Sequence, residues 1–232
     1  MSGRGENSFA HLPGFGAKLY DDFMKTKIIE LRTKEIAEDL VSRITSGRML
    51  VVGTGPGRLV QEIHKLSPNL ELFGLDISAA MIMQAKRNLM GTGINLLQGN
   101  IQTTDYKDDF FDLIACSGNF YLWDMPEVGL EEIYRILKKG QSAYLYEINK
   151  DIDRDEVGYW MRSNFRGENL LIRIVAPLFI MKQLRITYRL EEVEEIVEST
   201  SFRESYETEK LTLGGLPAWT RIKLTKHTNS LN

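Results

Sequence analysis

The sequence has too few cysteines and histidines for a disulfide framework or a metal centre. Its single cysteine, Cys116, excludes an intramolecular disulfide, and the three histidines, His11, His64 and His227, lack the spacing of zinc ligands. We therefore expect no metal. An apolar run of 18 residues and a hydrophobic leader are also missing, so we predict neither membrane spanning nor secretion and expect a cytoplasmic protein.

The charge balance and the chain length narrow the remaining classes of protein. The chain has 29 basic and 32 acidic residues and a formal net charge of −3, without the basic excess of nucleic-acid-binding proteins, so we expect no nucleic-acid partner. With 232 residues, of which 43% are hydrophobic, it can bury one sizeable α/β core. We expect no second autonomous domain.

Three glycines spaced two residues apart, Gly53, Gly55 and Gly57, follow an apolar run and form the strongest motif of the sequence. Glycine is needed where the backbone turns sharply or lies against a ligand, because a Cβ would clash or forbid positive φ. The helix that follows points its N–H groups and its positive end at such a ligand. A dinucleotide-binding turn would have its third glycine at the position of Arg58. The spacing therefore favours a different nucleotide cofactor.

An acidic residue stands where a ribose would lie in a doubly wound sheet. Asp76 ends the apolar run 70–75 and follows the first glycine by 23 residues. Because the second strand lies beside the first, its terminal carboxylate can accept hydrogen bonds from both ribose hydroxyls. Ile77 would face the base, and Ser78 can cap the helix that carries Met81. The alternative is that Asp76 is only an acid in a loop.

Further apolar runs predict a parallel sheet whose ligand-binding edge gathers residues from several strands. Asn100 and Ile101 follow the third strand and Ser117 follows the fourth, and ligands bind at such edges in open α/β sheets. A helix is predicted over 124–137, with Gly140 as its C-terminal cap. The predicted strands are 49–52, 70–75, 94–98, 110–116 and 141–147, with 201–207 and 218–224 as a closing antiparallel pair.

From about residue 48 to residue 147 the chain resembles the class I S-adenosylmethionine-dependent methyltransferases, and within them the small-molecule branch that includes the ubiquinone and menaquinone biosynthesis methyltransferases. Four phrases carry this resemblance: Val52–Gly57, Gly74–Met81, Asp109–Ile114 and Ile133–Gly140. The resemblance implies a Rossmann-like, seven-stranded, doubly wound α/β sheet with a terminal antiparallel hairpin. It also implies an enzyme that uses S-adenosyl-L-methionine to methylate a small molecule.

The resemblance also implies a set of cofactor-binding residues. The sequence departs from the family pattern at Val51, where an acid is usual, and at Asn100, where an aspartate commonly binds the adenine amino group. The amide oxygen of Asn100 can still accept that hydrogen bond. These two departures leave open a non-catalytic cofactor-binding protein. The predicted cofactor-binding residues are Gly53, Thr54, Gly55, Gly57, Asp76, Ile77, Met81, Asn100, Ile101, Ser117 and Tyr20.

Two segments lie outside the predicted core and are interpreted as lids. Residues 1–45 form an N-terminal segment with a mobile start, in which residues 20–23 lead into an amphipathic helix that reaches about residue 44. Tyr20 either covers the cofactor or packs the helix start. The methyltransferase domain then covers 46–232, with a helical insertion at about 152–188 in which Pro177 should kink or end a helix. In related small-molecule methyltransferases an N-terminal segment folds over the cofactor, and the length and place of the insertion indicate a cover for the substrate.

The insertion also bears on substrate and partners. From Arg162 to Arg189 it has six basic residues against the single Glu168, which favours an anionic or partly apolar acceptor. Packing against the core, a homodimer interface and peripheral contact with a membrane are the alternatives.

No catalytic residue can be assigned from the sequence. Asn119, Tyr121 and Tyr159 are interpreted as residues near the acceptor, and Cys116 as a buried strand residue. Methyl transfer from a sulfonium needs alignment more than a universal base. A methyltransferase for RNA or protein and a nicotinamide-dependent oxidoreductase remain the other candidate functions.

Overall fold

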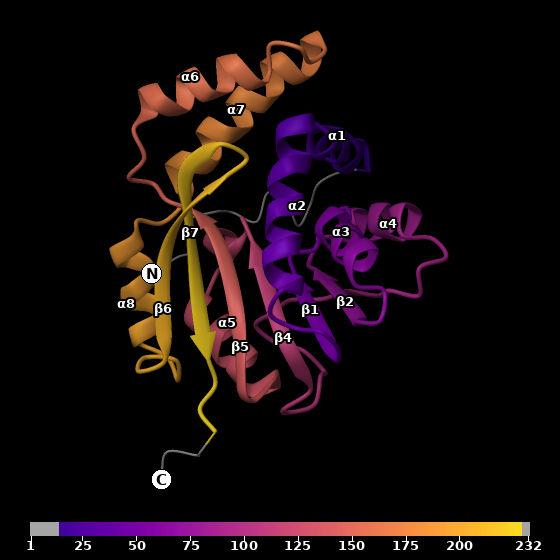
Figure 1. Ribbon diagram of the computed structural model, residues 1–232, viewed down its shortest axis with the longest axis vertical. Helices are drawn as coiled ribbons and strands as arrows, with labels where there is room; N and C mark the ends of the chain where they lie inside the picture. Colours follow the sequence, from indigo (N-terminus) through magenta and orange to yellow (C-terminus); the bar gives the residue numbers. More distant parts are fainter. Residues whose placement is uncertain (1–13, 229–232) are drawn as a thin grey trace.

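The computed structural model describes residues 14–228 and contains one seven-stranded mixed sheet (Figure 1). Its strands are β1 (Arg48–Val52), β2 (Glu71–Asp76), β3 (Asn95–Gln98), β4 (Phe111–Ser117), β5 (Leu137–Ile148), β6 (Tyr206–Leu213) and β7 (Leu216–Thr225). They lie in the order β3-β2-β1-β4-β5-β7-β6, and β7 is antiparallel to both of its neighbours. The predicted Rossmann-like sheet with its terminal hairpin is confirmed.

The central strands are apolar because both of their faces are covered by helices. Met49 to Val52 in β1 are all buried, and β4 is buried through most of its length. Near-continuous apolar runs are typical of parallel strands packed on both sides. Parallel pairing of β1 with β2 and with β4 brings the carboxyl ends of three strands to one edge of the sheet.

Two helical layers make two hydrophobic clusters, one on each face of the sheet (Figure 1). The helices are α1 (Gly14–Met24), α2 (Lys27–Val41), α3 (Arg58–Leu66), α4 (Ala79–Asn88), the short 3₁₀ helix η1 (Phe120–Leu122), α5 (Pro126–Ile136), α6 (Arg154–Asn164), α7 (Leu170–Ile186) and α8 (Leu190–Glu198). One cluster joins α1, α2, α3, α4, α6 and α7 to the sheet, and the other joins η1, α5 and α8. The first thirteen residues, which were predicted to be mobile, lie outside the described residues.

The predicted amphipathic helix is present as α2, but the residues that lead into it form a separate helix, α1, and the chain breaks between the two. Thr26 has extended backbone angles and is buried, and its hydroxyl donates a 2.9 Å hydrogen bond to the carbonyl of Phe23. A threonine side chain that bonds to nearby backbone competes with helix continuation. The break turns α1 away from the axis of α2.

Three other predictions of local structure need correction. α5 ends at Ile136, and Gly140 lies inside β5 instead of capping the helix. Strand β6 begins at Tyr206, because residues 201–205 form turns. Pro177 was predicted to kink or end a helix, and the second outcome is excluded because α7 continues through Pro177 to Ile186.

The insertion forms a helical hairpin, α6 and α7, that stands over the carboxyl edge of the sheet (Figure 1). Among residues 14–228, no helix combines the length and the apolar character that crossing a membrane requires.

Candidate cofactor and acceptor site

The glycine turn between β1 and α3 takes left-handed backbone angles at all three glycines. The φ angles are +64° at Gly53, +53° at Gly55 and +84° at Gly57, a region that favours glycine. A Cβ on Gly53 would collide with the side-chain amide of Asn119, and one on Gly57 would come within 2.7 Å of Leu89, which directly follows α4. Among residues 14–228, only Tyr20 comes within 4 Å of the missing Cβ of Gly55, at 3.8 Å. The turn is therefore packed on two sides and open at Gly55.

Asp76 ties the end of β2 to this turn. Its Oδ2 accepts a 2.7 Å hydrogen bond from the backbone N–H of Gly55, and its Oδ1 accepts one of 2.9 Å from the N–H of Ser78. Burial raises the pKa of Asp76 above its ordinary value, and the two backbone hydrogen bonds oppose that effect. Each carboxylate oxygen has a second lone pair for a further donor.

A cavity between the ends of β1, β2 and β4, which we call the β2-side cavity, contains nine of the eleven predicted cofactor residues. Thr54 and Gly57 are the two that do not line it. Asn100 lies in its wall, but the amide oxygen of Asn100 already accepts a 3.0 Å hydrogen bond from the N–H of Gln102. The nine residues are Tyr20, Gly53, Gly55, Asp76, Ile77, Met81, Asn100, Ile101 and Ser117.

A second cavity, the α2-side cavity, lies between α1, α2, α7 and the start of β7. Its wall is mostly apolar, with Phe23, Ile180 and Trp219 among the lining side chains, and Thr54 contributes to it. The two cavities share six residues, so they meet at one place. The shared residues are Tyr20, Gly53, Gly55, Ser117, Gly118 and Phe179.

Arg32 brings a positive charge into the α2-side cavity. Its guanidinium lies 4.9 Å from the ring centre of Trp219, and within residues 14–228 its Nε is buried without a hydrogen-bond partner. Burial lowers the pKa of Arg32, while Tyr20 and Tyr121 act in the opposite direction. Arginine stays charged in proteins, so this group favours an anion. Arg32 was not identified from the sequence, because it is one of several charged residues on an amphipathic helix.

Helix α1 is fixed over the glycine turn by a buried ion pair. Both oxygens of Asp21 accept hydrogen bonds from Arg58, at 2.8 and 2.9 Å, and Lys25 lies 3.0 Å from the same carboxylate. Burial acts to raise the pKa of Asp21, but the hydrogen bonds from Arg58 and Lys25 outweigh it and hold the pKa below its ordinary value. This pair places Tyr20 where the cavities meet, with its ring 5.6 Å from that of Phe179 on α7.

Glu147, near the end of β5, is a buried carboxylate beneath the loop that follows β4. Its Oε1 accepts hydrogen bonds of 3.1 Å from the N–H groups of Asn119 and Phe120, and within the described part of the chain its Oε2 is buried without a partner. Burial raises the pKa of Glu147 to about 7. Glu147 was not identified from the sequence, although an acid that ends a buried strand is the same signal that singled out Asp76.

The residues named near the acceptor have different environments. The amide of Asn119 is used within the protein, since it donates to the carbonyl of Val52 at 3.0 Å and accepts from the indole of Trp123 at 3.1 Å. Tyr121 is buried and lines the β2-side cavity. Tyr159 is 69% exposed on α6 and lines neither cavity.

Comparison with known proteins agrees with this geometry. A family described as "Methyltransferase domain" matches residues 49–140. The chain is 37% identical over 101 residues to the uncharacterized methyltransferase YdaC of Bacillus subtilis, covering 43% of this chain and 56% of that protein. It is 24% identical over 173 residues to a demethylmenaquinone methyltransferase of Porphyromonas gingivalis, covering 68% of this chain and 69% of that one. The chain spans about half the length of the first curated relatives it matches.

Solved structures share the whole fold. A protein from Methanococcus maripaludis that is assigned to the S-adenosyl-L-methionine-dependent methyltransferases is 26% identical, with a TM-score of 0.72 and coverage of 94% of this chain and 95% of that chain. The plantazolicin methyltransferase BpumL, solved with SAH, has a TM-score of 0.70 at 17% identity over 97% of this chain and 95% of that one.

These observations define the class: residues 49–140 match a methyltransferase domain, and the chain has the fold of the class I S-adenosylmethionine-dependent methyltransferases. Within that class the chain resembles the quinone biosynthesis methyltransferases, which include the ubiquinone/menaquinone biosynthesis C-methyltransferase UbiE of Geotalea daltonii at 26% identity over 52% of this chain and 54% of that one.

Proposed function

We propose that this protein transfers a methyl group from S-adenosyl-L-methionine to a small-molecule acceptor. The observation that carries the proposal is the meeting of two cavities at Tyr20, Ser117, Gly118 and Phe179. One cavity has the features of a nucleoside site, with a carboxylate at the end of β2 and apolar side chains beside it. The other has room for an acceptor beside the shared residues.

The residues of the β2-side cavity fit the nucleoside end of the cofactor. Asp76 has lone pairs left for the two ribose hydroxyls, and Ile77, Met81 and Ile101 offer apolar surface to the base. Asn100 would need to share or exchange its bond with Gln102 in order to accept from an adenine amino group. Gly57, in contrast, serves the packing of α3 against α4.

Arg32 and Gly55 fit the methionine end of the cofactor. A buried guanidinium without a partner at its Nε is costly, and a carboxylate in the cavity would supply that partner. We assign this carboxylate to the methionine end of the cofactor. Thr54, whose hydroxyl is also buried without a partner within residues 14–228, lies on the same side of the turn.

The main contribution of the protein to methyl transfer is then to position the two reactants. S-adenosyl-L-methionine supplies a methyl group activated by a positively charged sulfur. Tyr20 and Phe179 close the junction from α1 and α7 and keep water from it, while Ser117 and Gly118 form its floor. We propose α1 and the α6–α7 hairpin as the two parts of the lid.

The enclosing walls favour a small acceptor. Phe23, Ile180 and Trp219 surround the α2-side cavity with apolar surface, which suits a partly apolar molecule better than a folded RNA or protein. The resemblance to quinone biosynthesis methyltransferases supports the same choice.

Release of S-adenosylhomocysteine with a panel of phenols, hydroquinones, amines and carboxylic acids tests the proposal, with total RNA and protein as parallel acceptors. We expect turnover with at least one small molecule. Methyl transfer to RNA or protein alone would contradict the small acceptor, and tight cofactor binding without turnover on any acceptor would favour a non-catalytic cofactor-binding protein.

A further inference from the structure

Helix α7 is apolar on both of its sides, but the protein buries only one of them. Ile172, Ala176, Ile180 and Leu184 recur every four residues and are buried against the core. The other side also presents large apolar side chains to solvent: Leu170 is 71% exposed, Leu171 55%, Ile174 55% and Leu178 67%. A helix that is hydrophobic all round is normally covered on all sides.

The four exposed side chains form one patch, which we call the outer face of α7. Positions 170, 174 and 178 are four residues apart and therefore stack on one side of the helix, with Leu171 beside them. Scattered exposed apolar residues are ordinary on protein surfaces, whereas a contiguous row indicates contact with something.

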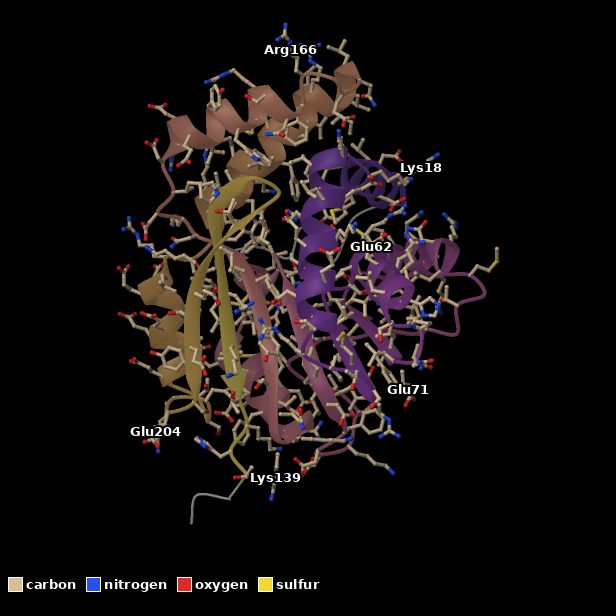
Figure 2. All side chains as sticks on the ribbon, in the orientation of Figure 1. Lys18, Glu62, Glu71, Lys139, Arg166 and Glu204 are labelled. Atoms are coloured by element: carbon tan, nitrogen blue, oxygen red, sulfur yellow. The ribbon has the colours of Figure 1, made fainter. Side chains whose placement is uncertain are left out.

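The charges around the outer face are positive. Lys182 and Arg185 are exposed one and two turns beyond Leu178 on the same side of the helix, and Arg173 is exposed beside Ile174. Arg166 lies in the turn between α6 and α7, at the far end of the molecule from Lys139 and Glu204 (Figure 2). Between residues 162 and 189 Glu168 is the only acid, although the chain as a whole is negative.

We propose that the outer face of α7 docks on an anionic lipid bilayer. Helices that lie in the membrane interface combine an apolar face with flanking lysine and arginine, and acidic headgroups attract those cations. A second copy of this chain is a poorer occupant, because a two-fold contact would place each cationic face against itself.

Docking has a consequence for the site, and this step rests on the proposed function. The inner side of the same helix carries Phe179, Ile180 and Gln183 into the α2-side cavity. The width of one helix, about 10 Å, therefore separates the bilayer surface from the acceptor cavity. An acceptor that partitions into lipid would reach the cavity without crossing bulk water.

Co-sedimentation of the purified full chain with vesicles tests the docking. We expect binding to vesicles of phosphatidylcholine with 30% phosphatidylglycerol, weaker binding to phosphatidylcholine alone, and loss of binding as salt is raised. The double variant Ile174→Gln and Leu178→Gln should bind at least tenfold more weakly, and so should Lys182→Glu with Arg185→Glu. The matched control is Met83→Gln with Met90→Gln, which changes two exposed side chains near α4 and should bind like the parent.

Circular dichroism and S-adenosylhomocysteine binding confirm that each variant folds. The proposal is overturned if the parent binds neither vesicle, or if the outer-face variant and the control bind equally. It is also overturned if the outer-face variant changes only the oligomeric state, which would make the patch an interface between copies. The vesicle assay needs no methyl acceptor, so its failure would leave the proposed methyl transfer standing.

Discussion

The carboxylate of Asp76 and the backbone N–H of Gly55 are joined by a 2.7 Å hydrogen bond across 21 residues of sequence. The bond fixes the end of β2 against Gly55, which, like Gly53, lines both cavities. Asp76 accepts this bond with one lone pair and has other lone pairs for a ligand. The same carboxylate therefore holds the turn in shape and can contact the cofactor. The account of the site depends on this coupling.

Substituting Gly53 by alanine tests how tightly the turn is packed. A Cβ there would have left-handed backbone angles and would collide with the amide of Asn119, which holds the loop after β4. Gly91→Ala is the matched control, because Gly91 has φ +83° and no atom of the described residues lies within 4 Å of its missing Cβ. In urea unfolding we expect Gly91→Ala to lower the free energy of unfolding by about 1–2 kcal/mol through backbone strain. Gly53→Ala should lower it by more. Equal losses would mean that the contact with Asn119 is unimportant.

Replacing Arg32 by methionine tests the site assigned to the carboxylate. We expect S-adenosylhomocysteine to bind roughly 10- to 100-fold more weakly, because hydrogen bonds to charged groups contribute about 1.5–3 kcal/mol. Binding of 5′-methylthioadenosine, which lacks the carboxylate, should change little. Calorimetry with both ligands measures the difference, and the control is Lys139→Met, which lines neither cavity and lies at the end of the molecule opposite Arg166 (Figure 2). If both ligands weaken equally, Arg32 supports the fold and does not hold the carboxylate.

The pH dependence of stability tests Glu147. Folding raises the pKa of this group from 4.5 to about 7, chiefly through burial, so the folded protein keeps a proton that the unfolded chain releases. Its contribution to stability is therefore complete below pH 4.5 and is lost as the pH rises through 7. Between pH 5 and pH 8 the parent should lose stability relative to Glu147→Gln, by at most about 3 kcal/mol.

Urea unfolding of the parent and of Glu147→Gln at several pH values measures this difference. Glutamine keeps an oxygen that can accept the hydrogen bonds from Asn119 and Phe120, so the variant should fold. It differs from the parent in having no carboxyl group that can gain or lose a proton. Parallel stability curves for the two proteins would show that Glu147 does not change its charge in this range.

The sheet and the glycine turn could be predicted because their signals are local. A short apolar run that ends in spaced glycines indicates β1 and its turn, and the predicted strand 49–52 differs by one residue from Arg48–Val52. Asp76 was found for the same reason, since it stands directly after an apolar run. The helix break at Thr26 was missed because one buried hydroxyl decides it.

Residues whose roles depend on packing between distant segments could not be found in this way. Arg32 enters the cavity only because α2 packs beside β7, which brings Trp219 under its guanidinium. The exposure of α7 is equally invisible in the sequence, where Ile174 and Ile180 look alike and only the fold separates outside from inside.

Calorimetric titration with S-adenosyl-L-methionine, S-adenosylhomocysteine and NADH, repeated with Asp76→Ala, tests the central claim most directly. Glu71→Ala, at the exposed opposite end of β2, is the control (Figure 2). We predict that both sulfur nucleosides bind the parent and the control, that NADH does not, and that Asp76→Ala weakens binding by about 100-fold or more through the loss of two charged hydrogen bonds. Binding of NADH alone, or equal binding of the sulfur nucleosides by the parent and Asp76→Ala, would contradict the account.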